Sequence, residues 1–252
     1  MTTTSPADSV ERKPELLGQT VVLIGGSAGI GLETARRARA EGAEVVLTAR
    51  NAERLETAAR EVGARSTAAF DATDWSALAR FFDDRPAPID HVLVTAGGPT
   101  YGPLLEMTAE EVRDALSDHI VQGLEVARYA SPKMRRGGTL ILMGGTGGRK
   151  VTAAGGIVSA ATAATPPFAA ALALELAPVR VNVIAAGFVD TPLSASILGD
   201  QLDARRNELR RTLPIGRVVQ PEDVAALAVH IMSNTALTGA TFDIDGGQQF
   251  VS

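Results

Sequence analysis

The 252-residue chain contains no cysteine, which excludes disulfides, zinc–thiolate sites and thiol catalysis. Its three histidines, His91, His119 and His230, lack the spacing of metal ligands, so we expect no metal site. Only 4% of residues are aromatic, and the net charge of -5 comes without a basic stripe, which argues against a nucleic-acid partner. No uninterrupted apolar run is long enough to span a bilayer and the N-terminus has no signal core, so we predict a soluble cytoplasmic protein.

Hydrophobic residues make up 45% of the chain, enough for one sizeable core. Short β-branched runs alternate with segments of helical period, a pattern that predicts repeated βαβ units and a parallel sheet. We therefore expect a flexible tail over 1–15 and a single doubly wound α/β Rossmann domain over 16–252, with ligands bound beyond the carboxyl ends of the strands. The seven predicted strands are Thr20–Ile24, Glu44–Thr48, Ser66–Phe70, His91–Thr95, Thr139–Met143, Val179–Ile184 and Thr241–Ile244. The predicted helices are Ile30–Glu41, Ala52–Glu61, Trp75–Phe82, Ala109–Lys133, Ser159–Leu176, Ser196–Thr212 and Glu222–Ser233.

The first predicted strand runs into the glycine-rich turn Gly25-Gly26-Ser27-Ala28-Gly29-Ile30-Gly31. Glycines let the backbone approach a pyrophosphate closely, and the following helix N-terminus offers unpaired N–H groups and a positive dipole end. A glycine pattern alone also fits a tight turn without a ligand. Its place between a strand and a helix favours a nucleotide site.

Four further segments recur in order along the chain, which at this point resembles the short-chain dehydrogenase/reductase family over residues 19–248. These segments are Asp71-Ala72-Thr73-Asp74; Val94-Thr95-Ala96-Gly97; Val181-Asn182 leading to Ala186-Gly187-Phe188-Val189-Asp190-Thr191-Pro192; and Thr238-Gly239-Ala240 with Asp245-Gly246-Gly247. The resemblance implies a dinucleotide cofactor and a small-molecule substrate, and it implies a homo-oligomer, a dimer or tetramer. It assigns Asp71 and Ala72 to the adenine, Ala96 and Gly97 to its ribose, and Val189 with Thr191 to the nicotinamide carboxamide. The cofactor set is Gly25, Ser27, Gly29, Ile30, Gly31, Arg50, Asp71, Ala72, Ala96, Gly97, Gly187, Val189 and Thr191.

The end of the second strand bears on the choice of cofactor. Ala49 stands where an NAD site usually has a carboxylate, and Arg50 follows it. A guanidinium can pair with a 2′-phosphate, so NADP(H) is favoured over NAD(H). The alternative is a surface pair between Arg50 and Glu53. Asn51 is expected to cap the next helix.

The segment that should carry the chemistry departs from the family. The resemblance implies a Tyr that exchanges the substrate's proton, a Lys four residues later, a Ser that holds the substrate oxygen and an Asn on the preceding helix. Hydride addition to a carbonyl leaves an alkoxide that must be protonated, so the site needs a proton donor and groups that hold the substrate oxygen. By alignment the Tyr, Lys, Ser and Asn positions hold Val158, Thr162, Gly145 and His119.

Other side chains are candidates for the missing roles. An imidazole can act as a proton donor or acceptor, which makes His119 a candidate, although a lone histidine on a helix is more often structural. Tyr101 follows the fourth strand, at the correct face of the sheet. Thr146 could replace the Ser hydroxyl and Thr162 could still bind the nicotinamide ribose. Tyr129-Ala130-Ser131-Pro132-Lys133 has the Tyr/Lys spacing, but it precedes the fifth strand, so we expect it at the opposite edge of the sheet.

Pro166-Pro167 falls inside the predicted catalytic helix, where an interior proline costs on the order of 3 kcal/mol, so we predict a break or kink near Thr165.

Two functions stay open. One is an NADP(H)-dependent oxidoreductase with a non-standard active site, whose substrate enters over residues 194–213. The other is a catalytically silent NADP(H)-binding sensor or partner subunit.

Overall fold

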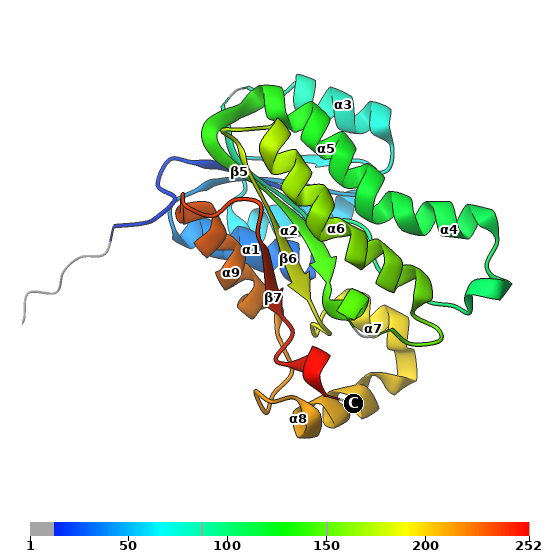
Figure 1. Cartoon of the computed structure of the whole chain (residues 1–252). Helices are drawn as coiled ribbons and strands as arrows, with labels where there is room; N and C mark the ends of the chain where they lie inside the picture. Colours follow the sequence, from blue (N-terminus) through cyan, green and yellow to red (C-terminus); the bar gives the residue numbers. More distant parts are fainter. Residues whose placement is uncertain (1–12, 87, 150, 252) are drawn as a thin grey trace, which may run out of the picture.

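The β-branched runs form a seven-stranded parallel sheet with the order β3-β2-β1-β4-β5-β6-β7 (Figure 1). The computed structural model describes residues 13–86, 88–149 and 151–251, so most of the expected tail lies outside the described residues. Each predicted strand is present, which confirms the doubly wound fold. The strands are β1 (Thr20–Ile24), β2 (Glu44–Ala49), β3 (Ser66–Ala69), β4 (Ile89–Val94), β5 (Met134–Gly145), β6 (Arg180–Ala186) and β7 (Thr241–Ile244).

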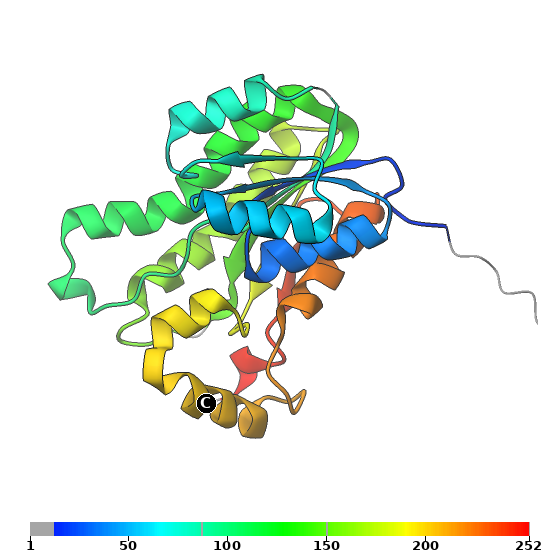
Figure 2. The ribbon, with the colours of Figure 1, turned by 180° about the vertical axis from the view of Figure 1, so that it is seen from behind.

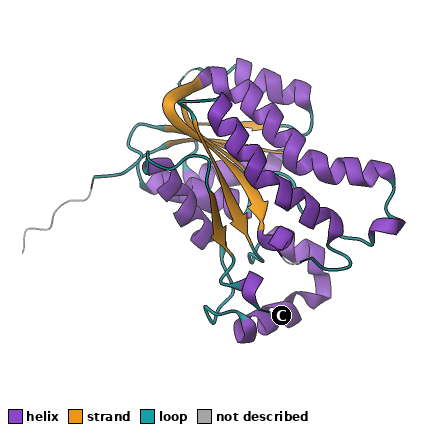
Figure 3. Cartoon of the chain, viewed as in Figure 1, coloured by secondary structure: helices purple, strands orange, loops and turns teal. Residues whose placement is uncertain are grey.

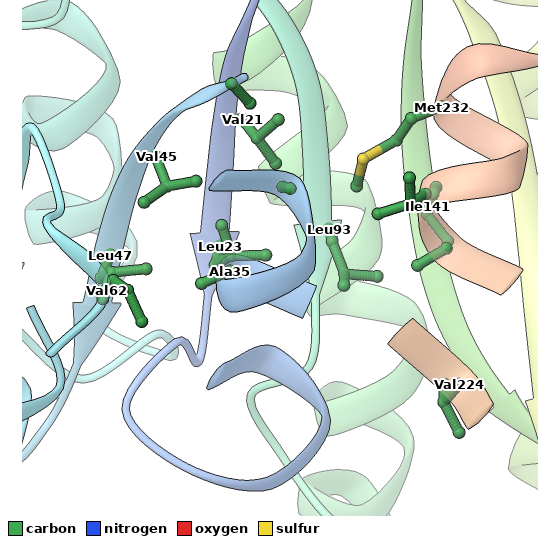
Figure 4. Close-up of a cluster of buried hydrophobic side chains, with 14 of the residues drawn as sticks. Val21, Leu23, Ala35, Val45, Leu47, Val62, Leu93, Ile141, Val224 and Met232 are labelled. Carbon is green, nitrogen blue, oxygen red and sulfur yellow. The ribbon is translucent and has the colours of Figure 1, made fainter. Parts of the chain in front are cut away.

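Alternate residues of the strands feed two separate hydrophobic clusters, because helices cover both faces of the sheet (Figure 3). Leu23 points toward α1, α2 and α9, while its neighbour Ile24 joins the cluster under α3, α5 and α6. Figure 4 shows the first cluster, in which Val21, Leu23 and Leu93 meet Ala35. The helices are α1 (Gly29–Ala40), α2 (Ala52–Val62), α3 (Trp75–Asp83), α4 (Ala109–Leu116), α5 (Gln122–Ala130), α6 (Gly156–Glu175), α7 (Pro192–Leu198), α8 (Leu202–Thr212) and α9 (Pro221–Ser233).

Two predicted helices differ in detail. The segment expected as one helix over Ser196–Thr212 is instead α7 and α8, because Gly199 adopts a left-handed φ of 50° between them. The long helix expected over Ala109–Lys133 is continuous but not uniform. The π-helical turn η2 (Ser117–Val121) separates α4 from α5, and the 3₁₀ turn η3 (Ser131–Lys133) ends it.

The predicted break near Thr165 is wrong, since α6 runs unbroken from Gly156 to Glu175. A kink at this position, the alternative, stays a prediction. The prolines remove only two N–H donors, and buried residues on both sides, Thr162 and Ala169 among them, hold the helix against β5 and β6. This 20-residue helix is also long and apolar enough to cross a membrane by length and composition, contrary to the expectation from the sequence. A buried core helix passes the same test, and α6 packs here on the sheet.

The strand order reverses between β1 and β4, and their carboxyl ends mark the position where doubly wound sheets bind ligands. In Figure 2, α7 and α8 lie beyond this edge of the sheet and near the C-terminal end of the chain. The turn η4 (Thr146–Arg149) follows β5 at the same edge. Segments far apart in sequence therefore converge beyond the carboxyl ends of the strands.

Candidate active site

A cavity of about 1040 Å³ opens at the carboxyl ends of β1, β4, β5 and β6, at the upper end of the size range of ligand sites. Its walls include Gly29, Ile30, Gly31, Ala96, Gly97, Gly187, Val189 and Thr191 of the predicted cofactor set. They also include His119, Tyr101, Thr146 and Thr162, with Gly145 and Val158. Gly25, Ser27, Arg50, Asp71 and Ala72 do not line it.

The glycine-rich turn has no room for side chains. A Cβ on Gly31 would lie 2.3 Å from the Gly25 carbonyl oxygen, and one on Gly25, whose φ is 104°, would lie 2.6 Å from the Ala96 nitrogen. Gly29, with φ of 52°, faces the cavity, where its nearest neighbour is Thr191. Gly25 and Gly31 thus permit the close backbone packing that leaves Gly29 at the wall.

The N-terminus of α1 suits a pyrophosphate. Ala28 occupies the N-cap position and provides no side-chain hydrogen bond, and the first turn carries no acidic residue. The first N–H groups of a helix lack internal partners, and here the protein supplies no anion for them. Because Ala28, Gly29 and Ile30 also line the cavity, this end fits the diphosphate of a dinucleotide.

Arg50 and Asp71 lie together beyond the ends of β2 and β3, with 3.8 Å between Nη1 and Oδ2. Arg50 is 80% exposed and free to turn toward a ligand, and it pairs with Asp71 rather than with Glu53. The Thr73 N–H, which donates to Asp71 at 2.9 Å, keeps the pKa of that carboxyl below its ordinary value. Asp71 therefore caps its own turn.

Arg54 is a residue that the sequence reasoning missed. Asn51 caps α2 as expected, accepting from the Arg54 N–H at 2.8 Å. This fixes the first turn of α2 beside the glycine-rich turn, where Arg54 Nε donates to Ser27 Oγ at 3.2 Å. A second guanidinium, besides that of Arg50, thus lies at the glycine-rich turn. Arg54 follows Arg50 by four residues, across the start of α2, and this spacing could have identified it from the sequence.

The far end of the cavity is built by the loop after β6. Thr191 caps α7 by accepting from the Ser194 N–H at 3.2 Å, and Ser194 Oγ donates to the Val189 carbonyl at 2.6 Å. Arg206 of α8 grips Asp190 through two hydrogen bonds of 2.9 and 2.7 Å. These contacts hold Val189 and Thr191 at the wall of the cavity and attach α8 to the loop after β6. Ile197 of α7 and Arg205 of α8 also line the cavity.

The positions expected to carry the chemistry are packed against one another. A Cβ on Gly145 would lie 3.0 Å from the Thr162 methyl group, so the methyl crowds the space of the missing serine. The Thr162 hydroxyl donates to the Val158 carbonyl at 2.7 Å, and it can offer a ligand only acceptor lone pairs. Val158 itself has no proton to give. Ser159, which the sequence reasoning overlooked, donates to the Gly147 carbonyl at 2.9 Å and ties η4 to α6.

Three candidates retain usable polar groups. Thr146 is buried at the wall, and its hydroxyl has no partner among the described residues. Partial burial raises the pKa of the Tyr101 phenol, an effect that the Arg205 guanidinium opposes, so the phenol is protonated at neutral pH. His119 Nδ1 lies 3.2 Å from the Ala115 carbonyl, which only accepts, so Nδ1 carries the proton and Nε2 is free to accept.

His119 lies within the π-turn η2, an irregularity that often accompanies functional sites. The Tyr129/Lys133 pair, in contrast, does not line the cavity, and Lys133 Nζ donates to the Asp83 carbonyl, 3.0 Å away at the end of α3. The structure therefore keeps this pair away from the other candidates. Asp118, the neighbour of His119, lines the cavity beside Gly97, and burial raises the pKa of its carboxyl.

Comparisons with known proteins agree with this architecture. The protein-family model described as enoyl-(acyl carrier protein) reductase matches residues 25–249. A short-chain dehydrogenase/reductase, ATR9, of Stachybotrys chlorohalonatus is 30% identical, covering 93% of this chain and 98% of its own. An NADP-dependent (R)-specific alcohol dehydrogenase of Lentilactobacillus kefiri is 29% identical over 92% and 97%.

A solved structure of a small-chain dehydrogenase in complex with NADPH superposes with a TM-score of 0.80 at 27% identity, covering 92% of this chain and 99% of that one. The range that the family model matches, 25–249, includes the glycine-rich turn and nearly all of the cavity lining. The family match extends over nearly all of the described fold. The chain therefore belongs to the short-chain dehydrogenase/reductase family of oxidoreductases.

Proposed function

We propose that this protein is an NADP(H)-dependent oxidoreductase whose active site works without the usual Tyr/Lys pair. The observation that carries the proposal is the shared cavity, since the anion-binding helix end, Val189 and Thr191 border the same space as Tyr101, His119 and Thr146. The relatives with NADP in their names support the choice of cofactor, together with Arg50 and Arg54. A bound nicotinamide supplies or accepts the hydride.

The side chains of the chain divide the remaining tasks. Thr146, with its free hydroxyl, holds the substrate oxygen, and Thr162 accepts a hydrogen bond from the nicotinamide ribose. Tyr101, whose phenol is protonated at neutral pH, is one candidate for the proton donor. His119 is the other candidate, and because its free Nε2 accepts in the neutral ring, it donates a proton only as an imidazolium. The substrate is a small molecule that enters beneath α7 and α8.

A second candidate function is a silent NADP(H)-binding sensor or partner subunit in the cytoplasm. The observation that favours it is the packing of Gly145, Val158 and Thr162, where no side chain has a proton to release. Under either function we propose a homo-oligomer, a dimer or tetramer, with α6 at an interface.

The test is calorimetric titration with NADPH and NADH, followed by a turnover screen over carbonyl and enone substrates. Tight NADPH binding with turnover that Tyr101→Phe or His119→Gln lowers at least tenfold supports the oxidoreductase. Tight binding without turnover on any substrate supports the sensor. If neither nucleotide binds, both functions are wrong.

A further inference from the structure

A second cavity, of about 210 Å³, lies directly behind the position of the missing serine. It is enclosed by the end of β5 and η4 on one side, β6 on another and α6 on the third. Gly144, Gly145 and Thr162 border both this cavity and the large one, so these three residues lie between the two spaces. The wall also includes Ala163 and Arg149, both exposed, so the second cavity extends toward the surface.

Two of the positions that align with the family's catalytic groups, Gly145 and Thr162, border this space. Gly144, Gly145 and Gly148 put no side chain into it, and Gly148 comes so close to α6 that a Cβ there would lie 2.9 Å from the Ala163 nitrogen. Pro166 forms part of the wall from α6. The loop is thus held tightly to the helix on either side of an open volume.

The wall of the second cavity is polar enough for water. Pro166 and Pro167 have no N–H, so the carbonyls of Thr162 and Ala163 lack the helical donor four residues further on. Arg149 adds a guanidinium, whose Nη1 donates to Asp243 and to Gln249. A water needs roughly 10–15 Å³ and two to four polar partners, so several waters fit here, whereas cavities that stay dry are apolar.

We propose that the second cavity holds a chain of waters that delivers the proton which no side chain at positions 145, 158 and 162 can supply. This inference rests on the proposed oxidoreductase function and makes water the proton donor in place of Tyr101 or His119. Addition of hydride to a carbonyl carbon leaves an alkoxide, and a water at the Gly145–Thr162 junction gives it a proton and becomes hydroxide. The hydroxide is reprotonated along the chain from solvent beside Arg149 and Ala163. Overall, one hydride and one proton convert the carbonyl into an alcohol.

The first test fills the second cavity alone. Ala185 of β6 is buried, borders the second cavity and not the large one, and tolerates a β-branched residue on a strand. We expect Ala185→Val to leave the NADPH dissociation constant within twofold and to lower carbonyl reduction at least tenfold. Added imidazolium, a small acid that enters the large cavity, should restore turnover, which it cannot do for structural damage.

The matched control is Gly147→Ala, which borders the large cavity only and whose Cβ would make an ordinary 3.8 Å contact with Thr162 Oγ1. It should change the KM for the substrate without any response to imidazolium. Wild-type turnover in Ala185→Val, or a loss that imidazolium fails to restore, overturns the proposal.

A high-resolution crystal structure of the wild-type protein separates this proposal from the proposed function. Ordered waters from Arg149 to Gly145 are the expected result, and a dry cavity overturns the water chain even if NADPH binds and turns over. Failure to bind NADPH instead overturns the proposed function, and the water chain with it, because no alkoxide forms.

Discussion

At the scale of single residues, the positions that align with the family's Ser, Tyr and Lys are packed against one another. The Thr162 methyl crowds the place of a side chain at position 145, and the Thr162 hydroxyl is bound to the helix carbonyl of Val158. Restoring one standard residue would therefore meet a neighbour that has adapted to its absence. The surroundings of Arg50 and Arg54 differ, since Arg50 is largely exposed and the Arg54 guanidinium donates to Ser27.

Arg50 and Arg54 lead to a prediction about cofactor selectivity. Arg50→Gln and Arg54→Gln should each weaken NADPH binding about tenfold to a hundredfold, because a charge-assisted hydrogen bond to a phosphate contributes roughly 1.5–3 kcal/mol. NADH, which has no 2′-phosphate, should bind equally well to both variants and wild type. Calorimetry measures both constants, and Arg60→Gln, near the end of α2, serves as the control. Equal losses for the two nucleotides would contradict a 2′-phosphate site.

At the scale of elements, α6 tolerates two prolines because packing on both sides outweighs the lost hydrogen bonds. Pro166→Ala returns an N–H donor to the Thr162 carbonyl, which stabilises the helix. It also gives the unfolded chain more conformational freedom, a smaller effect that opposes the gain, so we expect the free energy of unfolding to rise by about 1–2 kcal/mol. Urea unfolding measures the change. Pro192→Ala is the control, since Pro192 opens α7, where proline fits the first turn, and its removal should not stabilise the protein.

At the scale of the whole molecule, stability depends on one buried histidine away from the active site. His91 of β4 is 3% exposed, its Nε2 pairs with Gln19 Oε1 at 2.6 Å, and burial lowers its pKa from 6.5 to about 4. The unfolded chain binds this proton first as the pH falls. The contribution of His91 is therefore complete above pH 6.5 and is lost as the pH falls from 6.5 toward 4.

Protonation of His91 in the unfolded chain therefore lowers the free energy of unfolding by an amount on the order of 3 kcal/mol between pH 6.5 and pH 4. Urea unfolding across that range should give a shallower pH dependence for His91→Gln than for wild type. His230→Gln, at an exposed position of α9, should follow the wild-type curve. A parallel curve for His91→Gln would show that the histidine is not the titrating group.

The proposed oligomer gives the second prediction at this scale. Leu174 lies on the exposed side of α6, with 83% of its surface accessible to solvent. If α6 lies at a subunit interface, Leu174→Arg should move the protein toward the monomer in analytical ultracentrifugation. Leu105→Arg, equally exposed but on η1 (Leu104–Glu106), should leave the assembly intact. An unchanged assembly in Leu174→Arg would exclude that part of α6.

Local patterns in the sequence determined the family, the strands and the absence of the usual acid. A glycine-rich turn, strand periodicity and a missing Tyr/Lys pair lie in short contiguous segments, so their meaning does not depend on distant residues. Tertiary structure decided the rest. The Arg54–Ser27 contact, the packing of Thr162 against Gly145 and the continuity of α6 through Pro166 each depend on contacts from other elements. The second cavity behind Gly145 likewise exists only once β5, β6 and α6 are assembled.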